Sequence, residues 1–196
     1  MSYELKPLPC NPATVTGMSA GIIVSHYENN YGGAVKRLNA IEAQIAELDW
    51  ATAPAFAING LKREQMMAMN SMLLHEVFFD SLGASKASRG LGARMDVDFG
   101  GLAIWRKQFA AMGKALGGGS GWVVLAWSPH SGRLVNTWAA DHTGNIAGAV
   151  PLLALDMYEH SYHMDFGAQA GAYVDAFMNN LNLCGASKRL AATAGL

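Results

Sequence analysis

The sequence has few charged residues for its length. Lysine and arginine together number 14 and aspartate and glutamate 15, so charged residues make up 15% of the 196 residues, against 51% hydrophobic residues. An average soluble domain carries roughly 25% charged residues. We expect a compact core and a buried subunit interface to absorb this apolar excess. Because a nucleic-acid-binding surface needs a strong positive bias, the net charge of −1 argues against nucleic acid as a partner.

Cysteine and long apolar segments are also scarce. The chain has two cysteines, Cys10 and Cys184, which are too few for a disulfide framework. We expect both to be reduced thiols in a cytoplasmic protein, and a single structural bridge is the alternative. No segment approaches the roughly 18 consecutive apolar residues that cross a membrane. The first residues also lack the basic-then-apolar order of a signal peptide, so we expect no membrane partner.

The first half of the sequence predicts two long helices. Apolar residues recur every three or four positions from Ser19, a good N-cap, to Leu48, and again from about Leu61 to Leu82. The inward-facing residues predicted for the second helix are Met66, Met69, Leu73, Val77 and Phe78. Two long helices joined by a short break at Pro54 should form an antiparallel hairpin.

The second half predicts a small sheet with flanking helices. Residues 83–97 have little periodicity and form the candidate domain boundary. The expected elements after it are a helix over 99–116, strands over 122–127, 134–139 and 150–155, and a closing helix over 168–181. We therefore predict an α+β fold with an N-terminal helical-hairpin domain, residues 1–85, followed by a C-terminal domain, residues 86–196. The C-terminal domain should hold a three-stranded antiparallel sheet flanked by helices.

Histidine and aspartate residues at separate places in the sequence indicate a metal site. His26 lies near the start of the first long helix and His75 near the end of the second, so an antiparallel hairpin brings the two imidazoles together. Asp156 closes an apolar strand, where a buried carboxylate is costly without a cation, and His160 follows four residues later. Three imidazoles and one carboxylate suit iron or manganese and leave one coordination position open.

Each of these residues also has a simpler interpretation. A lone histidine in a helix is usually an ordinary core or surface residue. Asp156 can cap the helix that follows it. The neighbouring Glu159 and His160 can be a charged pair on the surface. The spacing alone therefore leaves the metal site and these structural roles open.

Several motifs resemble the iron/manganese superoxide dismutase family. The segment Asp156-x-x-Glu159-His160-x-Tyr162 is similar to the metal-binding signature of that family. Other segments that resemble the family, in the right order along nearly the whole chain, are Tyr3-Glu4-Leu5, His26-Tyr27, His75-x-x-Phe78 and Gly119-Ser120-Gly121-Trp122.

This resemblance implies a superoxide dismutase, an oxidoreductase that disproportionates superoxide to oxygen and hydrogen peroxide by one-electron cycling of a metal. It implies one iron or manganese ion per subunit, with the metal ligands His26, His75, Asp156 and His160. It also implies a homodimer or homotetramer, in which Glu159 reaches His160 of the partner subunit. His142 resembles the histidine that orients the active-site solvent in some members, so it is the candidate catalytic residue. Its simpler interpretation is a turn histidine.

The sequence departs from the family around the channel that leads to the metal. The family usually has a histidine four residues, and a tyrosine eight residues, after the first ligand, where this chain has Asn30 and Ala34. Tyr27 and Tyr31 differ in helical phase, so we do not expect either to replace the channel tyrosine. His163 stands where the family has the tyrosine that partners the missing histidine across the dimer. We therefore expect Asn30 and His163 to form a rebuilt hydrogen bond between subunits.

Two further replacements remove positive charge. Asn29 stands where a lysine is common, and Ala170 stands where the family has an arginine. We therefore expect dismutation to be slower and less dependent on salt than is usual for the family. Two alternatives keep the fold and the metal: another oxidoreductase with weak dismutase activity, or a dimeric metal-binding module that is not an enzyme. The sequence has no nucleotide-binding loop, nucleophile elbow or zinc-type cysteine cluster.

Overall fold

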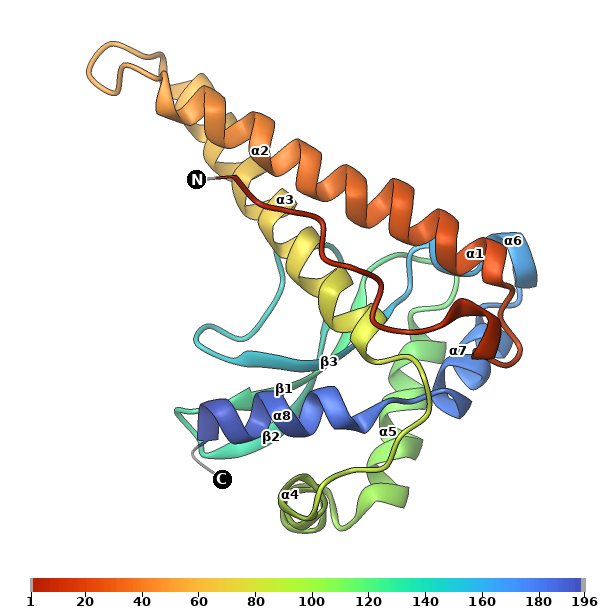
Figure 1. Cartoon of the computed structure of the whole chain (residues 1–196). Helices are drawn as coiled ribbons and strands as arrows, with labels where there is room; N and C mark the ends of the chain where they lie inside the picture. Colours follow the sequence, from red (N-terminus) through yellow and green to blue (C-terminus); the bar gives the residue numbers. More distant parts are fainter. Residues whose placement is uncertain (1, 195–196) are drawn as a thin grey trace.

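A computed structural model describes residues 2–194. An N-terminal segment with one short 3-10 helix (Pro12–Thr14) leads into a helical hairpin (Figure 1). Its elements are α1 (Ala20–Ser25), a π-helical turn (His26–Tyr31), α2 (Gly32–Ala46) and α3 (Ala55–Asp80). The Ser19 hydroxyl accepts a hydrogen bond from the backbone of Ile22 and caps α1. Helices α2 and α3 run side by side, and the tip of the hairpin projects away from the rest of the molecule.

A three-stranded antiparallel sheet forms the centre of the second half. Its strands are β1 (Trp122–Ser128), β2 (Arg133–Ala139) and β3 (Val150–Asp156), in the order β2-β1-β3. Every residue of the central strand β1 is buried. Trp122 pairs with Asp156 on one side and with Ala139 on the other. Because α3 packs against β3, this register brings Trp122 and Asp156 to the edge of the sheet that meets the hairpin.

Short helices surround the sheet. They are α4 (Arg89–Phe99), α5 (Leu102–Ala115), a 3-10 turn (Glu159–Ser161), α6 (His163–Phe166), α7 (Ala170–Asn179) and α8 (Leu183–Ala194). One hydrophobic cluster runs from Val15 in the N-terminal segment through the hairpin and the sheet to Leu190 in α8. The predicted α+β class, with an antiparallel helical hairpin followed by a small antiparallel sheet and flanking helices, is confirmed.

Three predicted elements differ from the structure. Residues 83–97 were expected to be irregular, but α4 occupies most of this segment because the Ser88 side chain caps it. The helix expected from residue 99 begins only at Leu102, since Gly100 and Gly101 have φ angles of 79° and 126° that break a helix. The closing helix expected over residues 168–181 is α7, and a further helix, α8, follows it that was not predicted.

The buried face of α3 is also displaced from the predicted one. Met66 and Leu73 are 47% and 45% exposed, although the apolar spacing placed them inside. Ala68, Met72 and Phe79 are buried instead. The error arises because α3 is covered by α2 on one side and by the sheet on another, so a single apolar stripe does not identify its inner face.

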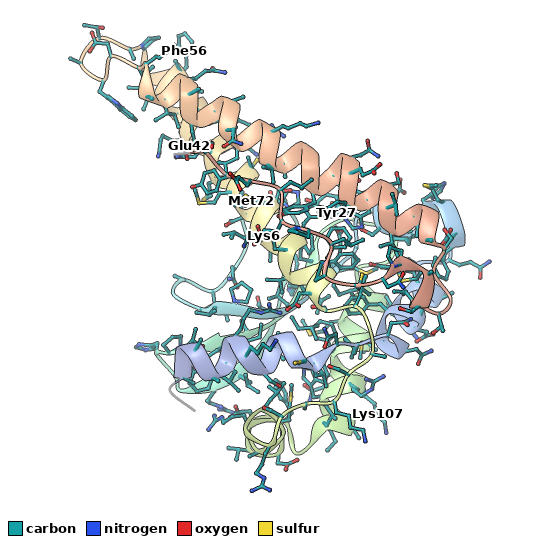
Figure 2. The ribbon with its side chains drawn as sticks, viewed as in Figure 1. Lys6, Tyr27, Glu42, Phe56, Met72 and Lys107 are labelled. Atoms are coloured by element: carbon teal, nitrogen blue, oxygen red, sulfur yellow. The ribbon has the colours of Figure 1, made fainter. Side chains whose placement is uncertain are left out.

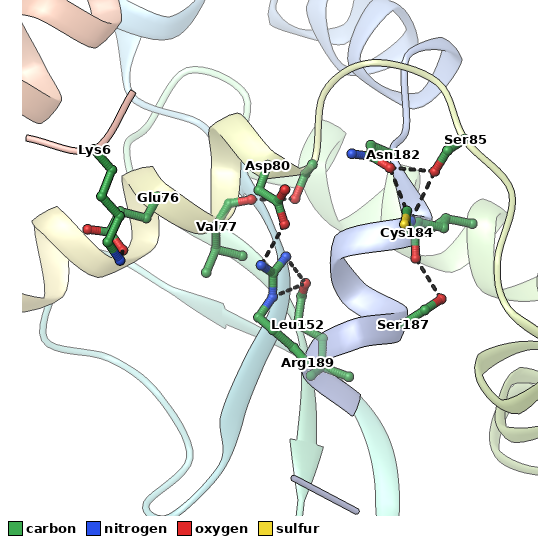
Figure 3. Close-up of polar contacts among 12 residues, drawn as sticks. Lys6, Glu76, Val77, Asp80, Ser85, Leu152, Asn182, Cys184, Ser187 and Arg189 are labelled. Carbon is green, nitrogen blue, oxygen red and sulfur yellow. Dashed lines mark hydrogen bonds and ion pairs between the residues drawn. The ribbon is translucent and has the colours of Figure 1, made fainter. Parts of the chain in front are cut away.

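The C-terminal helix α8 is held by polar contacts to β3 and to the end of α3 (Figure 3). The Arg189 guanidinium donates to the Leu152 carbonyl of β3 at 2.7 and 3.0 Å and to Asp80 at the end of α3 at 2.6 Å. Gly185 lies so close to Asp80 that a Cβ at this position would overlap the carboxylate. These contacts lock α8 against both β3 and α3.

Two other expectations concern the chain as a whole. Cys10 and Cys184 are both free thiols. Within residues 2–194, no helix combines the length and the apolar character needed to cross a membrane.

Candidate metal centre

Four side chains converge between the hairpin and the sheet to form what we call the His/Asp cluster: His26, His75, Asp156 and His160. One ligand atom from each lies within 4.8 Å of the others. The distances from Asp156 Oδ2 to the Nε2 atoms of His26, His75 and His160 are 3.2, 3.5 and 3.1 Å. The imidazoles of His26 and His75 meet with ring centroids 5.0 Å apart, as the hairpin predicts.

These distances fit a single first-row metal ion. Bonds of about 2.1 Å at angles of 90° to 120° hold neighbouring ligand atoms about 3.0 to 3.6 Å apart. The Nε2 atoms of His26 and His75 are buried, and neither has a hydrogen-bond partner among residues 2–194. A buried polar atom without a partner is costly, and a metal ion in the cluster would satisfy both.

Local structure aims each side chain at the cluster. His26 opens the π-helical turn, and π-helical turns are frequent at functional sites because one extra residue re-aims the side chains. His75 Nδ1 donates to the Ser71 carbonyl at 2.7 Å, which leaves the Nε2 lone pair facing the cluster. Asp156 Oδ1 accepts from the backbone of Tyr158 at 2.9 Å, which leaves Oδ2 free to bind.

Burial determines the charge of the cluster. Loss of hydration lowers the pKa of His26, and the same loss together with the nearby His26 lowers the pKa of His75 to about 3. Burial alone would raise the pKa of Asp156, but its contacts with His160 and His26 hold that pKa well below its usual range. The ionised Asp156 carboxylate lies beside the neutral, buried imidazoles of His26 and His75, and this arrangement favours binding of a cation.

His142 lies beside the cluster, with its ring centroid 6.2 Å from that of His75. Its Nδ1 accepts a hydrogen bond from the Trp122 indole at 3.0 Å. Because an indole N–H can only donate, the neutral His142 ring carries its proton on Nε2. The ring stacks on Tyr158 at 4.9 Å, and Tyr158 in turn stacks on His160. Burial raises the pKa of Tyr158 to about 12, so its phenol keeps its proton.

A cavity of about 210 Å³ reaches His142 from the surface, and we call it the α2–α3 cavity. Its lining residues are Asn29, Asn30, Gly33, Ala34, Arg37, Met67, Ala68, Ser71 and His142. Asn30 and Ala34, which stand where the family has larger side chains, therefore lie on its wall. Arg37 is not among the residues predicted from the sequence. Its position could have indicated it, since it lies three residues after Ala34 and four after Gly33 and therefore shares their helical face.

Tyr27 and Tyr31 point away from this cavity. The Tyr27 hydroxyl donates to the Lys6 carbonyl at 2.8 Å, and Figure 2 shows Tyr27 beside the N-terminal segment that carries Lys6. The Tyr31 hydroxyl donates to Glu76 at 3.0 Å. Both tyrosines line a different cavity of about 490 Å³, next to Pro7. Neither therefore takes the place of a channel tyrosine.

One side of the His/Asp cluster faces the surface. The side chain of His160 is 27% exposed, whereas those of the other three members are almost completely buried. Glu159 and His163 lie on either side of His160 in the sequence and are exposed. The adjacent Met164 is 68% exposed.

Comparisons with known proteins identify the family. Residues 87–189 match the family described as iron/manganese superoxide dismutases, C-terminal domain. The chain is 63% identical over 193 residues to a superoxide dismutase [Fe] of Cupriavidus metallidurans, with 98% of each chain covered. It is 33% identical to a superoxide dismutase [Mn] of Halobacterium salinarum, covering 89% of this chain and 88% of the relative. A superoxide dismutase [Fe] of Aquifex pyrophilus is 32% identical, with 92% and 88% covered.

Proposed function

This chain belongs to the iron/manganese superoxide dismutase family, and from that premise we propose how its residues carry out the reaction. It is an oxidoreductase that converts two superoxide ions and two protons into oxygen and hydrogen peroxide. We assign one metal ion per subunit to the His/Asp cluster, with all four members as ligands. The observation that carries this assignment is the convergence of three Nε2 atoms on one buried carboxylate oxygen.

The one-electron oxidation and reduction of superoxide are the chemistry that iron or manganese supplies when bound. The protein residues orient the ligands and supply protons. The Ser71 carbonyl holds the His75 ring in the ligating tautomer, and Trp122 holds the proton of His142 on Nε2. We assign His142 the catalytic role of holding and passing a proton at that atom, because it lies beside the His/Asp cluster and also lines the α2–α3 cavity.

We propose iron as the natural metal. The 63% identical relative is named as the iron form, and its identity covers nearly the full length of both chains. The ligand types accept manganese as well, as the names of other relatives illustrate.

We further propose that the protein is a cytoplasmic homodimer with an antioxidant role. The exposed side of His160 supports a subunit interface there, with Glu159 and His163 in contact with the partner subunit. Two free thiols are typical of a reducing compartment.

The test combines elemental analysis with a superoxide-dismutation assay on one purified sample. We expect close to one iron or manganese ion per chain together with activity. His26→Ala should lose both, and His130→Ala, which changes an exposed histidine in the β1–β2 turn, should lose neither. A full metal site without activity would contradict the dismutase assignment. Absence of both metals from the wild-type protein would contradict the ligand assignment.

A further inference from the structure

The walls of the α2–α3 cavity are two helical faces with short side chains. On one side Gly33, Ala34 and Arg37 lie three or four residues apart on one face of α2, and Asn30 precedes them in the π-helical turn. On the other side Met67, Ala68 and Ser71 lie at successive turns along one face of α3. The small residues leave the cavity open, and its volume of about 210 Å³ has room for several water molecules.

Arg37 carries the one permanent charge among the described residues that line this cavity. Its side chain is 58% exposed and forms an ion pair with Glu64, which also pairs with Arg63. Among the lining residues, Arg37 is therefore at the more exposed part of the cavity and the half-buried His142 at its inner part. Burial lowers the pKa of His142 and the carboxylate of Asp156 opposes this, while the charge of Arg37 is the smallest of several contributions.

The rest of the molecule provides little attraction for an anion. The net charge is −1, so the protein has no overall positive field. A cavity with low-dielectric walls focuses the field of a charge at its mouth and raises the local concentration of counter-ions. Met67 and Ala68 form such a wall opposite Ala34. A single arginine at this position therefore has a larger effect on an entering anion than an arginine elsewhere on the surface.

We propose that Arg37 is the anion-guiding residue of this enzyme: it draws superoxide and other small monovalent anions into the α2–α3 cavity, and Glu64 holds it in place while offsetting part of its charge. The proposal rests on the dismutase function. It differs from the expectation of weak salt dependence, which considered only the charges lost at Asn29 and Ala170.

The test compares Arg37→Gln with Lys36→Gln in the metal-loaded enzyme. The two substitutions change the net charge equally and lie next to each other, but Lys36 does not line the cavity. Arg37→Gln should lower kcat/KM about twofold to threefold at low ionic strength, which is the size of effect expected for one partly screened charge. The difference should vanish at high salt. Lys36→Gln should leave kcat/KM unchanged at both low and high ionic strength. Glu64→Gln should raise kcat/KM, because it removes the charge that offsets Arg37.

A second readout does not depend on turnover. The dissociation constant of azide, a small monovalent anion, is measured by optical titration of the same proteins. It should rise about twofold to threefold in Arg37→Gln, and Arg37→Lys should restore it. Equal behaviour of Arg37→Gln and Lys36→Gln in both assays would overturn the proposal. An inactive wild-type enzyme would contradict the dismutase function instead, and azide binding would still decide the role of Arg37.

Discussion

Single hydrogen bonds decide the chemical state of the histidines at this site. A backbone carbonyl accepts the proton of His75 Nδ1, so Nε2 is free to bind. The indole of Trp122 occupies His142 Nδ1, so the other nitrogen of that ring bears the proton. One histidine is thereby prepared as a ligand and the other as a proton donor, although both begin with the same side-chain chemistry.

Replacement of His142 tests its catalytic role. We expect His142→Ala to lower kcat about tenfold or more, because residues that orient a metal centre typically contribute tenfold to hundredfold. The metal content should stay near the wild-type value, since His142 is outside the His/Asp cluster. His142→Gln, which keeps a hydrogen-bond donor, should recover part of the activity. Steady-state kinetics and elemental analysis of the same preparations measure both effects, and unchanged kcat in His142→Ala would contradict the role.

The metal-free protein should become less stable as the pH falls. The pKa of His75 is lowered from an ordinary value of 6.5 to about 3 in the folded state. Between these values the unfolded chain binds a proton that the folded chain does not, so the free energy of unfolding decreases as the pH falls. The lowered pKa of Asp156 acts in the same direction at lower pH.

The measurement is the midpoint of thermal unfolding of chelator-treated protein as the pH is lowered. We expect the midpoint to fall as the pH is lowered from about 6.5 to about 3. It should fall less steeply in His75→Gln, which removes the titrating ring. A midpoint that stays constant with pH in the metal-free wild type would disprove this linkage.

At the level of the elements, the π-helical turn and the start of β1 position the site. The π-helical turn buries His26 and Tyr31 together, five residues apart. At the start of β1, the Gly121 carbonyl accepts from the backbone of Met157 at 2.9 Å and so connects β1 to the segment just after Asp156.

Gly121→Ala should therefore damage both stability and metal binding. A Cβ at Gly121 would lie 1.9 Å from the Ala139 carbonyl oxygen, and its φ of +132° is unfavourable for other residues. We expect the free energy of unfolding to fall by at least about 3 kcal/mol, with reduced metal content. Gly118→Ala is the control, because Gly118 also has a positive φ, of +85°, but open space around it.

Gly118→Ala should lower the free energy of unfolding by only about 1 kcal/mol, because it strains the backbone without creating a clash. Urea unfolding of the metal-free variants provides both values. Similar losses for the two variants would show that the close approach to Ala139 is unimportant.

The elements themselves were largely predictable from local sequence. The hairpin, the three strands and the N-cap at Ser19 follow from apolar periodicity and capping chemistry, which act over a few residues. The inner face of α3 was not predictable in this way, as the exposed Met66 and Leu73 illustrate. That face depends on which neighbours cover the helix, and those neighbours come from distant parts of the chain.

At the scale of the whole molecule, the His/Asp cluster draws ligands from both halves of the chain. Two ligands come from the hairpin, and two come from β3 and the 3-10 turn after it. The division into domains at residues 1–85 and 86–196 remains a proposal. One hydrophobic cluster crosses that boundary, so we expect the two parts to unfold together in the metal-loaded protein.

The oligomeric state is a property of the whole molecule that can be measured directly. We expect light scattering to give the mass of a dimer, and His163→Ala to weaken the dimer or lower its activity, because His163 borders the exposed side of His160. Lys107→Ala changes an exposed residue of α5 and should alter neither property. A His163→Ala variant with wild-type mass and activity would rule out His163 as an interface residue.

The sequence by itself determined the element types, the scarcity of charge and the residues that resemble the metal-binding signature. These properties depend on short-range spacing and composition, which a linear sequence records directly. Only the tertiary structure decided that three Nε2 atoms meet one oxygen of Asp156, that Trp122 reaches His142, and that Arg37 lies at the mouth of a cavity. Each of these contacts joins elements that are distant in sequence. Their distances depend on how helices and sheet pack, and no local pattern specifies that packing.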